Sequence, residues 1–96
     1  MTTIHNGNLE KSHTFTLTSK CGEQVVAIKI EGYGNSEGSS AIHLILNNEE
    51  YKSKVLNGKF RFTWSGDWYS DEAIVRYVAN SASAVNLKLD YRMECI

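Results

Sequence analysis

The sequence predicts an all-β domain, an antiparallel β-sandwich of about seven strands with a jelly-roll-like or Ig-like arrangement. Apolar and polar residues alternate with a period of two along most of the chain. Clusters of Gly, Asn and Ser separate the alternating runs at spacings of about 8 to 12 residues. No segment sustains the period of a helix. A five-stranded OB-type barrel is the alternative fold, because its size also fits.

Length and composition predict one domain over residues 1–96. The chain has 96 residues, of which 42% are hydrophobic and 22% charged. This length is close to that of a single domain and well below the length at which hydrophobic cores divide. The composition is typical of a soluble globular protein, so we expect one core and no disordered region.

The alternating runs define the expected strands. They cover residues 13–19, 24–33, 42–46, 51–55, 60–64, 74–79 and 85–95. The last run is the clearest, because every second residue from Val85 to Cys95 is apolar and a helix could not bring that set to one face. Residues 1–11 are polar and aperiodic, which predicts a loose segment or a short edge strand.

Turn residues mark the expected connections between these strands. We expect turns at residues 19–23, at Asn47–Asn48 and at residues 80–83. Asn57–Gly58 is the strongest hairpin signal, since both residues tolerate the positive φ of a type I′ turn. The glycine-rich segment Gly32–Ser40 predicts the longest flexible connection.

The net charge indicates which partners to expect, and the first residues of the sequence indicate the location. The net charge is −1, which gives no overall field to attract nucleic acid or anionic lipid, so we expect neither a nucleic-acid nor a membrane partner. The first residues contain neither a basic region nor an apolar run of the kind found in secretory signals. A cytoplasmic protein is therefore expected, and a mature secreted form is the alternative.

The two cysteines, Cys21 and Cys95, lie far apart in the sequence and outside any CxxC or Cys/His pattern. This spacing indicates neither metal binding nor redox chemistry. For a cytoplasmic protein it favours a reduced pair over a disulfide.

One loop combines aromatic, acidic and hydroxyl side chains, and the sequence predicts a ligand-binding site there. Its candidate residues are Asp67, Trp68, Tyr69 and Asp71. Aromatic rings stack on sugar rings while carboxylates bind hydroxyls, so the expected ligand is a glycan or a small polar molecule. In the alternative interpretation, Trp68 or Tyr69 closes one end of the fold and the acids are solvated. Trp64 is assigned to the core.

Two expected strands are apolar on both faces, which predicts a covered outer sheet face. The candidate interface residues are Val25, Ala27, His43 and Ile45. The N-terminal segment, a neighbouring loop, a homodimer contact or an adaptor contact with another protein would cover them. The sequence thus supports a second function, a protein-interaction domain.

No catalytic motif is present. His5, His13 and His43 are scattered, and no serine lies in a GxSxG elbow. The acids Asp67, Asp71 and Glu72 lack the spacing of an EF-hand, so no metal site is predicted. We expect a non-enzymatic binding module without a cofactor.

Overall fold

The computed structural model describes residues 1–80 and 84–96, and the described residues form six β-strands and no helix. The strands are β1 (Thr2–Leu9), β2 (His13–Thr18), β3 (Val25–Leu46), β4 (Glu49–Asp67), β5 (Glu72–Val78) and β6 (Ala84–Cys95). All pairings are antiparallel and belong to one sheet with the order β1-β6-β3-β5-β2, in which β4 also pairs with β3.

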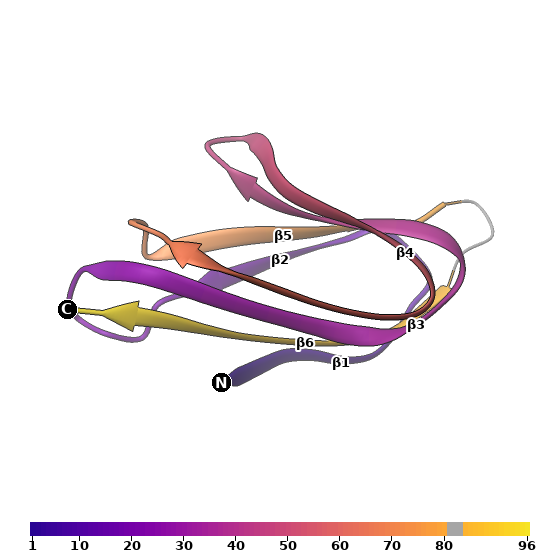
Figure 1. Ribbon diagram of the computed structural model, residues 1–96, viewed down its shortest axis with the longest axis horizontal. Helices are drawn as coiled ribbons and strands as arrows, with labels where there is room; N and C mark the ends of the chain where they lie inside the picture. Colours follow the sequence, from indigo (N-terminus) through magenta and orange to yellow (C-terminus); the bar gives the residue numbers. More distant parts are fainter. Residues whose placement is uncertain (81–83) are drawn as a thin grey trace.

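The long strands β3 and β4 bend together and divide the sheet into two arms (Figure 1). The β6 arm contains β1, β6, residues 25–37 of β3 and residues 58–67 of β4. The β5 arm contains β2, β5, residues 40–46 of β3 and residues 49–56 of β4. The two arms face each other, so the sheet forms a curled half-barrel.

The bend, which we call the corner, consists of residues 36–40 of β3 and residues 56–58 of β4, where the register between the two strands shifts. Gly38 and Gly58 have positive φ angles of 76° and 70°, a conformation that glycine adopts without a steric penalty. On the inner side, the hydroxyls of Ser36 and Ser40 are buried and lie 3.2 Å apart. The residues that suggested turns therefore form a corner within continuous strands.

Two sequence predictions are wrong for this reason. Asn57–Gly58 is not a hairpin turn, because Gly58 pairs with Ser36 and lies inside β4. Residues 32–40 are not a flexible connection, because they continue β3. The predicted strands at 24–33 and 42–46 are one strand, as are those at 51–55 and 60–64. The β3–β4 hairpin instead turns at Asn47–Asn48, both with positive φ, which confirms the turn predicted there.

Glycines allow β3 to remain a strand because its neighbours approach closely. A Cβ atom on Gly32 would collide with the ring of Phe62, which lies across from it on β4. A Cβ atom on Gly34 would collide with the carbonyl group of Asn86 on β6. These glycines therefore permit close packing on both sides of β3 rather than flexibility.

The all-β, antiparallel class is confirmed, whereas a sandwich of seven strands with a jelly-roll or Ig arrangement is not. Side chains from both arms fill one core, and Leu17, Ile42, Val75, Leu87 and Leu89 are almost completely buried in it. Residues 2–9 form the edge strand β1. Of the turn predicted at residues 80–83, residues 81–83 lie outside the described residues.

Candidate functional site

The loop that connects β4 to β5 contains the predicted ligand-binding residues, but Trp68 does not face solvent. Its side chain is 4% exposed, and its Nε1 donates a hydrogen bond to the carbonyl oxygen of Glu72 at 3.0 Å. Its backbone N–H donates to the carbonyl oxygen of Val26 at 3.2 Å, and its ring centroid lies 6.3 Å from that of Tyr51. Trp68 therefore closes the edge of the half-barrel, which is the alternative considered from the sequence.

The other predicted ligand-binding residues remain at the surface. Tyr69 is 70% exposed, and Asp67 and Asp71 are exposed as well. The backbone carbonyl oxygen of Asp71 accepts a hydrogen bond from the N–H of Ser19 at 2.8 Å, which attaches the loop to the end of β2. The depression next to Trp68 and Asp67 holds only about 10 Å³, whereas a second one of about 170 Å³ is lined by Trp68, Ser70 and Glu72 together with the β3–β4 turn.

The four predicted interface residues do not lie on one face. Val25 is 3% exposed and belongs to the core, so its placement on an outer face is wrong. The register between β3 and β6 shifts between Val25 and Ala27, and this bulge turns the two side chains to opposite faces. Ala27 lies on the outer face of the β6 arm, whereas His43 and Ile45 lie on the outer face of the β5 arm.

Two apolar rows cross the outer face of the β5 arm. Ala41 of β3 pairs with Val55 of β4 on one side and Val78 of β5 on the other, and Ile45 pairs with Ile74 of β5. Val55 is 68% exposed, and the other four residues are partly exposed. Solvent normally favours polar side chains on such a face, so these rows form an unusual apolar surface.

Polar groups divide and border these apolar rows. His43 lies between the rows beside Arg76 of β5, and its Nδ1 is 3.3 Å from Oε2 of Glu50 on β4. Toward the sheet edge, Thr16 of β2 continues the row of Ile45 and Ile74, and Thr14 continues the row of His43 and Arg76. The face therefore has a polar row at its centre and an apolar row on each side of it.

The outer face of the β6 arm is polar and carries charge pairs. Lys29 Nζ lies 3.4 Å from Glu31 Oε1 on β3, and Arg92 Nη2 lies 3.1 Å from Glu94 Oε1 on β6. Ala27 is the small apolar residue at the far end of this face, beside Glu94. This face is therefore compatible with water without a covering partner.

Tyr33 of β3 lies on the same face, between two cations from the neighbouring strands. The Arg61 guanidinium carbon of β4 is 5.1 Å from the ring centroid, and Lys88 Nζ of β6 is 5.6 Å from it. A side-chain hydrogen bond with Tyr33 raises the pKa of Lys88 above its ordinary value, and the charges of Tyr33 and Asp90 contribute to this shift. Sequence alternation gave no indication of this cluster, because its members come from three strands.

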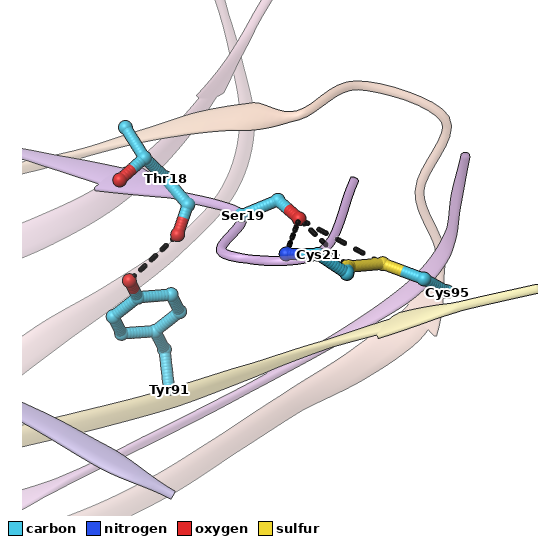
Figure 2. Close-up of a disulfide and its surroundings, with 5 residues drawn as sticks. All are labelled: Thr18, Ser19, Cys21, Tyr91 and Cys95. Atoms are coloured by element: carbon cyan, nitrogen blue, oxygen red, sulfur yellow. Dashed lines mark hydrogen bonds between the residues drawn. A yellow bond between two sulfur atoms is a disulfide. The ribbon is translucent and has the colours of Figure 1, made fainter. Parts of the chain in front are cut away.

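Cys21 and Cys95 form a disulfide, so the prediction of a reduced pair is wrong (Figure 2). The pairing of Val25 with Cys95 brings the end of β6 to the start of β3, four residues after Cys21. The Tyr91 hydroxyl donates a hydrogen bond to the carbonyl oxygen of Thr18 at 2.7 Å close by. These contacts attach the loop after β2, in the β5 arm, to β6 in the other arm.

A groove of about 450 Å³ lies beside this disulfide. Thr18 lines it from the end of β2, Ser19 and Lys20 from the loop that follows, and Tyr91 and Arg92 from β6. None of the residues predicted as ligand-binding or interface residues is among those that line it in the described part of the chain.

No protein-family model, curated protein or solved structure matches this chain. Within residues 1–80 and 84–96, no group of three or more His, Cys, Asp or Glu side chains is placed to hold a metal ion. Nor do these residues form a helix that is long and apolar enough to cross a membrane.

Sequence analysis missed Ala41, Val55, Ile74 and Val78 as members of the apolar surface. The signal was present, because Ile74 and Val78 are the apolar residues on the second face of the predicted strand 74–79. What the sequence lacked was the strand order that places β4 and β5 on either side of β3.

Proposed function

We propose that this domain is a non-enzymatic binding module that associates with a second copy of itself through the outer face of the β5 arm. The two apolar rows formed by Val55, Ala41, Val78, Ile45 and Ile74 support this proposal. Transfer of such side chains from water to a protein contact contributes roughly 25 cal/mol for each Å² of apolar surface buried.

The size of the face indicates a weak association. Four strands at a spacing of about 4.8 Å, each about six residues long, give a face of roughly 20 by 20 Å, or about 400 Å². Standard interfaces bury about 800 Å² on each partner, and smaller ones belong to transient complexes. We therefore expect a dissociation constant in the range of about 10 to 200 μM.

The charges on this face favour a second copy as the partner. Arg76 lies on β5 and Glu50 on β4, on opposite sides of β3. In a two-fold contact whose axis runs along β3, β5 of one copy faces β4 of the other. Each Arg76 then approaches the Glu50 of the second copy, so the contact contains two equivalent opposite-charge pairs.

The test is sedimentation equilibrium of the wild-type chain between about 5 and 500 μM, a range that spans the expected constant. Val55→Lys places a charge in an apolar row and should leave a monomer across this range. The matched control is Thr63→Lys, which adds the same charge to an exposed position of β4 in the β6 arm. Thr63→Lys should associate like the wild type. A monomeric wild-type chain at the highest concentration would overturn the proposal.

A second candidate function is carbohydrate binding by the loop between β4 and β5. Tyr69 favours it, because its ring is largely exposed between the exposed acids Asp67 and Asp71. Trp68 would act as the anchor of this loop through its hydrogen bond to Glu72. An exposed ring on an anchored loop suits stacking on a sugar, with carboxylates available for its hydroxyls.

This candidate is tested on a glycan array with the wild-type chain and Tyr69→Ala. Binding of a neutral glycan that Tyr69→Ala abolishes, with an unchanged melting temperature, would support it. Tyr51→Ala, which removes the partly exposed ring beside Trp68, is the control and should still bind. The candidate fails if no neutral glycan binds the wild-type chain.

The cytoplasmic location predicted from the sequence remains a prediction, and the disulfide favours the alternative of a secreted form. Disulfides in small domains persist in oxidising compartments and are rare in the cytosol. Alkylation of the denatured native protein, followed by mass measurement, tests this directly. Two alkylated cysteines would support the cytoplasmic location, and none would support an oxidising one.

A further inference from the structure

A histidine lies between the two apolar rows on the outer face of the β5 arm. His43 is the only histidine of β3, β4 and β5, strands whose residues the structure describes completely. On β3 its neighbours on the same face are Ala41 and Ile45, one from each apolar row. Imidazoles change charge between about pH 5 and 8, so the centre of this face can be neutral or positive under physiological conditions.

Two charged side chains lie next to the ring of His43 on the neighbouring strands. Its Nδ1 is 3.3 Å from Oε2 of Glu50 on β4, and Arg76 is its cross-strand partner on β5. Its cross-strand partner on β4 is the uncharged Ser53, and Thr14 of β2 follows Arg76 toward the sheet edge. The row at the centre of the face thus contains one permanent cation, one carboxylate beside it and one group that can gain a charge.

The lysines of β4 in this arm do not face His43. Lys52 pairs with Leu44 and Lys54 pairs with Ile42, and both of these partners are core residues. Cross-strand partners lie on the same face of a sheet, so both lysines are on the face opposite to His43. The charge around the ring is therefore set by Glu50 and Arg76.

Glu50 would have a different cation in the proposed dimer than in the free chain. In the free chain its carboxylate lies beside Nδ1 of His43, which is buried and has no hydrogen-bond partner among the described residues. A proton on that nitrogen would face the carboxylate. In the two-fold contact described above, Arg76 of the second copy approaches the same carboxylate. A guanidinium keeps its charge at every physiological pH, so it competes with a protonated His43 for Glu50.

The same contact would bring the two His43 rings together. A two-fold axis along β3 places each outward residue of that strand opposite the same residue of the second copy. With neutral rings, the charges of Glu50 and Arg76 cancel on each copy. With protonated rings, each copy adds a positive charge at the centre of the contact, between apolar rows that exclude water. Like charges in such surroundings cost free energy, because both repulsion and the loss of hydration oppose the contact.

From this arrangement we propose that protonation of His43 dissociates the dimer, which makes self-association sensitive to pH. The inference rests on the proposed function, because it concerns the regulation of that same contact. The free chain binds the proton on His43 more tightly than the dimer does. By linkage, the dimer forms above neutral pH and is lost as the pH falls through the range in which imidazoles gain a proton.

The experiment is sedimentation equilibrium of the full chain at about pH 5.5, 6.5, 7.5 and 8.5 and constant ionic strength. The dissociation constant should rise at least about tenfold from the third of these pH values to the first, because both rings must lose a proton before the contact forms. His43→Gln is neutral throughout, and its dissociation constant should vary by less than about twofold over this range. His43→Lys is positive throughout and should stay monomeric up to about 500 μM at every pH.

The matched control is His13→Gln, which removes an imidazole from an exposed position of β2 outside the apolar rows. It changes the net charge as His43→Gln does and should keep the pH dependence of the wild type.

A wild-type dimer with the same dissociation constant at every pH would overturn this inference and leave the proposed function in place. The same holds if His43→Gln keeps the pH dependence of the wild type, or if it fails to associate at every pH. A wild-type chain that is monomeric at every pH would overturn both.

Discussion

The two arms of the sheet share β3 and β4, yet their outer faces differ in chemistry. On the β6 arm, Lys29 and Arg92 lie close to glutamates, and polar side chains cover most of the face. On the β5 arm, apolar rows that include Val55 and Ile74 face outward. The change occurs at the corner, within continuous strands.

This difference shows that a strand with a bend can contribute to two outer faces of different chemistry. The polar outer face of the β6 arm is compatible with exposure to water. Covering the apolar rows of the β5 arm would lower the free energy, because apolar side chains would leave water. The inner faces do not differ in this way, because side chains from both arms contribute to a single core. The arms thus share one core, while their outer faces differ in polarity.

The largest expected effect comes from the disulfide, the covalent connection between the arms. Cys21 and Cys95 are 74 residues apart, and a loop of that length stabilises the folded state by about 4 kcal/mol in the chain-entropy model. Cys21→Ser/Cys95→Ser should therefore lower the free energy of unfolding by about 4 kcal/mol in urea denaturation. A reducing agent should have the same effect on the wild type and none on the variant. Loss of less than about 1 kcal/mol would mean that the arms hold together without the disulfide.

A smaller effect is expected within the β6 arm. Gly34→Ala places a Cβ atom against the Asn86 carbonyl group and should lower the free energy of unfolding by about 1 to 3 kcal/mol, because β3 and β6 must separate. Gly7→Ala in β1 is the control, since nothing lies within 4 Å of the added atom. Thermal unfolding of both variants decides the matter, and equal melting temperatures would contradict close packing of β3 on β6.

The smallest expected effect on the free energy of unfolding comes from two buried tyrosines, one in each arm. Tyr91 of β6 donates a hydrogen bond to Thr18, whereas the buried hydroxyl of Tyr77 in β5 has no hydrogen-bond partner among the described residues. Tyr91→Phe should lower the free energy of unfolding by about 1 kcal/mol, and Tyr77→Phe should leave it unchanged or raise it by up to about 1 kcal/mol. Urea denaturation of both variants measures the difference, and a larger loss for Tyr77→Phe would show that its hydroxyl is satisfied.

The sequence by itself determined the extended segments outside the corner and, in most of these runs, which side chains face inward. Leu87, Leu89 and Tyr91 are buried as their alternation predicted, and Trp64 belongs to the core. His43 and Ile45 lie on an outer face as expected. These features depend on a local property, the two-residue period of a strand, which can be read without knowledge of neighbouring strands.

Only the tertiary structure decided the strand order, the corner, the disulfide and the two outer faces. Gly58 in β4 is a corner residue rather than a turn residue because Ser36 of β3 lies opposite it. The bulge near Val26 sends Val25 into the core and Ala27 outward, against simple alternation. Likewise, the Tyr33 cluster exists only because β4, β3 and β6 are adjacent. Each of these features depends on pairings between distant segments, and such pairings leave no periodic signal in the sequence.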